Sequence, residues 1–151
     1  MIEILNKFTK KFLGKTAWGV KIGYGSFLTI EFGVPNNYQT NMSVHGEWHL
    51  WFYLCCWRIE KDGYFIVGSE DTKEKLIEGV KKIEGRKLNS FEICPQTLDL
   101  LLTFESNLLL RSFSVIGDVE GDEDKPHWML YMPDNRVLVA GPGNRWVIEE
   151  S

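Results

Sequence analysis

Three polar residues at alternate positions, His45, Glu47 and His49, are the first candidates for chemistry in this sequence. Residues i and i+2 of a β-strand share a face roughly 6–7 Å apart, so two of the three could reach one metal ion. Imidazole and carboxylate groups are zinc ligands, and His127 adds a third imidazole if the fold brings it near. A polar strand end that leads into an aromatic core is the simpler interpretation. We therefore expect no metal or other cofactor, with His45, Glu47 and His49 as the alternative.

The same segment continues into a run of aromatic residues. If one strand runs from 47 to 59, one of its faces carries His49, Trp51, Tyr53 and Trp57. Aromatic side chains beside polar groups are typical of a ligand-binding cleft. They are equally typical of a central strand that is covered on both faces. A small-molecule or metal-binding protein, or an enzyme that uses this face, is the alternative function.

An acidic cluster lies further along the chain and comprises Asp118, Glu120, Asp122, Glu123 and Asp124. Its alternation suggests a calcium loop, but Glu123 and Met129 occupy the positions where an EF-hand needs glycine and glutamate. In an exposed loop, such acids attract a basic protein partner and increase its rate of association. The five acids are therefore the predicted partner-binding residues.

Nucleophilic catalysis has little support in the sequence. There is no GxSxG motif, and Cys94 precedes a proline instead of opening a helix that would activate its thiol. Cys55 and Cys56 are adjacent in a strand pattern, so their side chains point to opposite faces. Three cysteines at irregular spacing form neither a disulfide framework nor a zinc finger. We predict reduced thiols in a cytoplasmic protein with no catalytic residues, which is not an enzyme.

Two amphipathic segments, 2–13 and 70–84, predict helices, and most other segments alternate with the period of strands. About eight or nine strands joined by hairpin turns indicate an α+β fold. We expect a mainly antiparallel sheet with the two helices packed against it, and a strongly curled sheet or half-barrel is the alternative. A length of 151 residues is typical of a single domain, here 1–151.

Composition excludes several classes of protein. Hydrophobic residues make up 44% and charged residues 25%, which is typical of a folded domain and not of a disordered chain. The net charge of −4 argues against nucleic-acid binding. The longest nearly apolar run, 50–57, is too short to cross a bilayer, and the N-terminus lacks the apolar core of a signal peptide. We expect no membrane association, and the oligomeric state stays open.

The sequence pattern of five segments resembles that of small bacterial proteins of the toxin-immunity type. These segments are residues 18–32, 46–51, 113–114, 128–135 and 141–146. The resemblance implies a non-catalytic binding protein that neutralises a toxin domain by direct protein–protein contact. It implies no catalytic residues. Many toxins that act on nucleic acid are basic, so an acidic inhibitor gains association rate and specificity. The expected partner is therefore a basic toxin domain.

Overall fold

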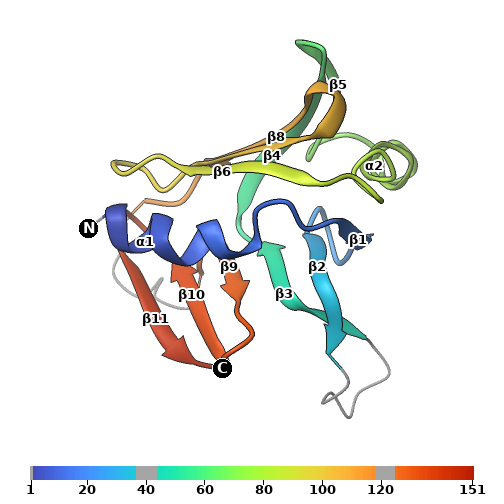
Figure 1. Ribbon diagram of the computed structural model, residues 1–151. Coiled ribbons are helices and arrows are strands. Elements are labelled where there is room, and N and C mark those ends of the chain that lie inside the picture. The colour runs from blue at the N-terminus through green and yellow to red at the C-terminus, as the bar shows by residue number, and fades with distance from the viewer. Residues whose placement is uncertain (1, 37–43, 118–124) are drawn as a thin grey trace.

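Hairpin connections arrange the chain into two antiparallel sheets whose inner faces pack together (Figure 1). The computed structural model describes residues 2–36, 44–117 and 125–151. The first sheet has the order β1 (Ala17–Ile22), β2 (Leu28–Asn36), β3 (His45–Phe52), β9 (Trp128–Tyr131), β10 (Arg136–Ala140) and β11 (Trp146–Glu150). The second has the order β5 (Tyr64–Gly68), β4 (Cys55–Lys61), β8 (Leu108–Ser114), β7 (Leu100–Phe104) and β6 (Leu88–Ile93).

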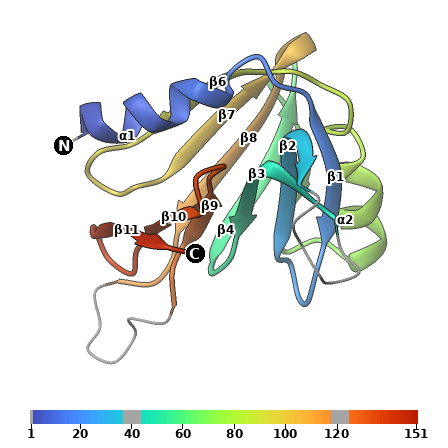
Figure 2. The ribbon, with the colours of Figure 1, turned by 60° about the horizontal axis from the view of Figure 1, so that its bottom comes forward.

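Two α-helices accompany the sheets. Helix α1 (Ile2–Thr9) continues into a 3₁₀ turn, Lys10–Phe12, and lies along β6 (Figure 2). Helix α2 (Lys73–Val80) packs against β1 and β5, and the side chain of Thr72 caps its N-terminus. A second 3₁₀ turn, Glu105–Asn107, joins β7 to β8. The predicted α+β class with antiparallel sheets is therefore confirmed, although the strands form two sheets instead of one.

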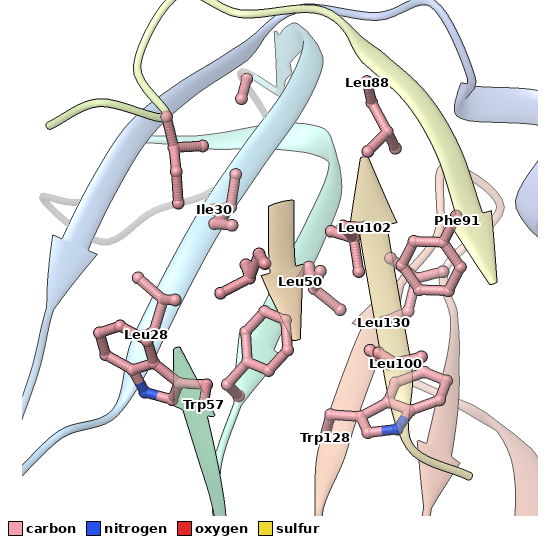
Figure 3. Close-up of a cluster of buried hydrophobic side chains, with 14 of the residues drawn as sticks. Leu28, Ile30, Leu50, Trp57, Leu88, Phe91, Leu100, Leu102, Trp128 and Leu130 are labelled. Carbon is pink, nitrogen blue, oxygen red and sulfur yellow. The ribbon is translucent and has the colours of Figure 1, made fainter. Parts of the chain in front are cut away.

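The core lies between the two sheets. Strand β3 alternates half-buried and buried residues, as expected for a strand with one face turned inward, and in β2 the buried Glu31 interrupts this alternation. Leu28, Ile30 and Leu50 of the first sheet meet Leu100 and Leu102 of the second (Figure 3). The ring of Phe12 lies between the layers, in contact with Phe32 and Trp48 on one side and Phe91 on the other.

The expectation of one continuous strand from 47 to 59 is wrong. Strand β3 ends at Phe52 in the first sheet, and β4 begins at Cys55 in the second. At the crossing, the amides of Tyr53 and Leu54 donate to the carbonyl oxygens of His127 and Pro126 at 2.9 and 3.2 Å. The first half of this aromatic run therefore belongs to the first sheet and the second half to the second sheet, so the two halves have different surroundings. Within the described residues, no helix has the length and apolarity to span a bilayer.

Candidate functional site

Glu31, His45 and His49 form one cluster on the outer face of the first sheet. Nδ1 of His49 lies 2.7 Å from Oε2 of Glu31, and Nδ1 of His45 lies 3.3 Å from the same oxygen. The two imidazole rings are 4.3 Å apart, centroid to centroid. One donor atom from each residue falls within 4.8 Å of the other two, so the three side chains can meet at one ion. We call these three residues the metal-ligand triad.

An irregularity between β2 and β3 shapes this site. The strands pair Phe32 with Trp48 and then Pro35 with Gly46, so β2 has one residue more than β3 across this step. Such a bulge bends the strand pair and redirects side chains. The amide of Gly46 donates to Oε1 of Glu31 at 2.9 Å, and the indole of Trp18 donates to the carbonyl of Gly33 at 2.8 Å. Side chains thus form hydrogen bonds with the backbone groups around the bulge.

Glycine is needed at Gly46 because the two backbones approach closely here. A Cβ atom at this position would lie 2.6 Å from the carbonyl oxygen of Phe32. Gly33 has a φ of +82°, a left-handed conformation that glycine adopts without strain. These two residues therefore permit the bulge, and the bulge brings the Gly46 amide to the Glu31 carboxylate.

Glu31 is a buried acid, with 3% of its surface exposed. Burial raises the pKa of its carboxyl group, but the hydrogen bonds from His49 and the Gly46 amide, and the charges of both imidazoles, lower it by more. The net pKa of Glu31 lies below its ordinary value, so this carboxyl group is an anion at neutral pH. The site therefore holds a buried negative charge between two imidazoles.

The cluster differs at one position from the alternative ligand set of His45, Glu47 and His49. His45 and His49 do come together, but Glu31 of the neighbouring strand takes the place assigned to Glu47. The Glu47 carboxylate instead lies 3.0 Å from Nζ of Lys15 and accepts a hydrogen bond from the Val34 amide. Strand pairing could not be read from local spacing, which is why Glu31 was missed. The one available signal was a charged residue in the apolar pattern of residues 27–32.

Beside the triad lies a group of half-buried and exposed aromatic side chains, which we call the aromatic patch: Tyr24, Phe27, Trp51 and Tyr53. Phe27 lies 4.6 Å from Tyr53 and 6.2 Å from Trp51 between ring centroids. Tyr24 lies 6.4 Å from Phe27 and is 88% exposed. The indole nitrogen of Trp51 is shielded from solvent and has no hydrogen-bond partner among the described residues.

The register of the sheet places the triad and the patch in adjacent rows. His49 pairs with Glu31 on one side and Tyr131 on the other. Trp51 stands two residues further along β3 and therefore on the same face as His49. The polar and aromatic groups thus share one surface of the first sheet.

Two other candidates lie elsewhere. Trp57 is 2% exposed, and its indole donates to the carbonyl of Ser26 at 2.8 Å, so it does not share the outer face with Trp51 and Tyr53 (Figure 3 shows Trp57 in the core). His127 is also buried, with Nε2 3.2 Å from the carbonyl oxygen of Gly143, and it is not part of the triad. The position of Trp57 follows from the crossing between the sheets, since β4 belongs to the second sheet.

The acidic residues Asp118, Glu120, Asp122, Glu123 and Asp124 lie outside the described residues. The cysteines are free: Cys55 is buried, Cys56 is half-buried and Cys94 is exposed. The described site is therefore the outer face of the first sheet, with its triad and its aromatic patch. Comparisons with protein-family models, curated proteins and solved structures find no match to this chain.

Proposed function

We propose that this protein is a non-catalytic binding protein, an immunity-type inhibitor that neutralises a toxin domain by direct contact. The observation that carries the proposal is the aromatic patch, in which neighbouring rings pack on one another at an exposed part of the first sheet. Tyrosine and tryptophan dominate the binding energy of many protein interfaces. Trp51 lies in β3, and Tyr24, Phe27 and Tyr53 lie just outside the strands. Rings that already pack on one another lose little conformational entropy when a partner binds.

The charge of the chain supports a basic partner. Segment 118–124 contains five acidic residues and no basic residue, whereas the net charge of the whole chain is −4. The acidic excess of the protein is therefore concentrated in this segment. Concentrated charge accelerates association with an oppositely charged protein and makes the association rate depend on salt. We place the protein in the cytoplasm as part of the same proposal, because its three cysteines are free.

The test begins with a pull-down from the source cell, with the purified product of the adjacent upstream gene included as prey. A stoichiometric partner is expected. Its affinity is then measured for Tyr24→Ala and for a matched control, Tyr64→Ala. Tyr24 and Tyr64 are 88% and 77% exposed, and they lie near different sheets. Tyr24→Ala should weaken binding by about 30-fold, as expected for a residue that dominates an interface. Equal losses in both variants, or no partner, would contradict the proposal.

A charge-reversal variant separates the electrostatic contribution from the aromatic one. Replacing Asp122, Glu123 and Asp124 with lysine should slow association at low salt and change dissociation less. An unchanged association rate at low salt would remove the electrostatic part of the proposal. The aromatic patch would then carry recognition alone.

A second candidate function, metal binding, is favoured by the convergence of Glu31, His45 and His49.

A further inference from the structure

We propose that Glu31, His45 and His49 form a binding site for a divalent transition-metal ion, with Zn²⁺ as the best match. The donor set is two imidazole nitrogens and one carboxylate oxygen, a combination that zinc uses in sites with an open coordination position. All three donor atoms already lie within 4.8 Å of one another. The inference is independent of the proposed partner, since it rests on the triad alone.

The charge distribution around Glu31 favours a bound cation. Glu31 is buried, and its partners among the described residues are the two imidazoles and the amide of Gly46. Lysine and arginine are absent from this set, so the imidazoles alone face the buried carboxylate, and a buried carboxylate is costly unless it is well paired. A divalent ion would supply a full countercharge at the point that both imidazoles face.

Both imidazoles converge on one oxygen atom of Glu31. Nδ1 of His45 and Nδ1 of His49 both point at Oε2 of Glu31. Both imidazoles thus contact one oxygen atom of the carboxylate, while Oε1 accepts from the backbone. An ion bound to the two Nδ1 atoms and to Oε2 would take the place of the protons that now lie between them. The hydrogen bond from the Gly46 amide would keep the carboxylate oriented, since groups that hydrogen-bond to metal ligands commonly hold them in place.

The distances between the donor atoms are close to those of a zinc site. Zinc–ligand bonds of about 2.0–2.1 Å in a tetrahedron place donor atoms about 3.3 Å apart. The contact between His45 and Glu31 is already 3.3 Å, and that between His49 and Glu31 is 2.7 Å. Small side-chain rotations are therefore sufficient to admit the ion. The side chain of His45 is 29% exposed and that of His49 is 11% exposed, so the ion would enter from the His45 side and keep one position open there.

The experiment uses the full chain, without a histidine tag, and Zn²⁺ as the probe. Affinity is measured by competition with a chromophoric chelator, and the imidazole ¹⁵N resonances are followed by NMR during the titration. One equivalent of Zn²⁺ should shift the resonances of His45 and His49. Those of His127 should stay in place, because His127 is buried away from the triad. Co²⁺ in the same site should give the visible absorption of a four- or five-coordinate ion.

Three variants assign the ligands. Glu31→Gln and His45→Gln should each weaken Zn²⁺ binding by about 100-fold or more. Loss of a residue that only hydrogen-bonds to a metal ligand already lowers metal affinity by about 10–100-fold. The matched control is Glu47→Gln, which removes a nearby carboxylate that faces Lys15 and should leave the affinity unchanged. His45→Gln alters a partly exposed side chain, so it keeps the test valid if Glu31→Gln unfolds.

Three results would overturn the site. They are the absence of stoichiometric Zn²⁺ binding, equal losses in His45→Gln and Glu47→Gln, and shifts of His127 in place of His45 and His49. None of them bears on the aromatic patch, whose test uses Tyr24 and Tyr64.

Discussion

The imidazole rings of His45 and His49 lie 4.3 Å apart, although His49 is the fourth residue after His45 along the same strand. A flat strand would place the backbones of residues i and i+4 about 13 Å apart, at about 3.3 Å for each residue. The two rings lean toward each other over Glu31, and the neighbouring bulge bends the strand pair that holds them. The geometry of the triad therefore depends on the backbone around Gly46.

Gly46→Ala should destabilise the protein by about 1–3 kcal/mol, because the new Cβ would clash with backbone atoms that cannot move aside. The nearest is the carbonyl oxygen of Phe32, at 2.6 Å. Urea denaturation measures the change in the free energy of unfolding. Gly23→Ala is the control, since its Cβ would meet only ordinary contacts, the nearest at 3.7 Å. A neutral Gly46→Ala would show that the strands are not so closely apposed.

Glu60 should contribute to stability in a pH-dependent way. Its carboxylate accepts hydrogen bonds from Nε of Arg58 at 2.8 Å and from Nε of Arg111 at 2.7 Å. Desolvation raises the pKa of Glu60, but these two guanidinium groups lower it by more, so the folded-state pKa lies below the ordinary value of 4.5. Stabilisation from this group is therefore present above about pH 4.5 and is lost as the pH falls through the folded-state pKa.

Glu60→Gln should lower the free energy of unfolding by about 1 kcal/mol at pH 7, a small value because both arginines are partly exposed. The difference from the unsubstituted protein should shrink at pH 3. Urea denaturation at the two pH values tests this. Glu78→Gln, which alters an exposed pair with Lys81, should have little effect at either pH. A constant difference across pH would refute the role of the Glu60 charge.

The cysteines should differ in reactivity. Burial is the main cause that raises the pKa of the Cys55 thiol to about 12. Hydrogen bonds from Thr97, and from the backbone amide of Gln96, lower the pKa of the exposed Cys94 thiol. Iodoacetamide at pH 8 should therefore modify Cys94 first, and Cys55 only after unfolding. Peptide mass spectrometry over time measures the order, and modification of Cys55 at the rate of Cys94 would contradict it.

Two tryptophans of the aromatic run should respond differently to truncation. Trp57→Ala removes a core side chain and should destabilise the protein by about 3–5 kcal/mol. Trp51→Ala removes a half-buried side chain from the outer face and should cost about 1–2 kcal/mol. Thermal and urea denaturation of both variants provide the comparison. Similar losses would mean that the strand does not cross between sheets as the structure shows.

The sequence alone was sufficient for the antiparallel α+β class, because alternation and turn residues are local properties. It also placed His45 and His49 on one face, since both lie at odd-numbered positions of the same strand. The tertiary structure decided the rest. Strand pairing brought Glu31 to the imidazoles, and Glu47 lies against Lys15 instead. The crossing after Phe52 sent Trp57 into the core. Pairing partners and sheet crossings depend on contacts between distant residues, which local spacing does not encode.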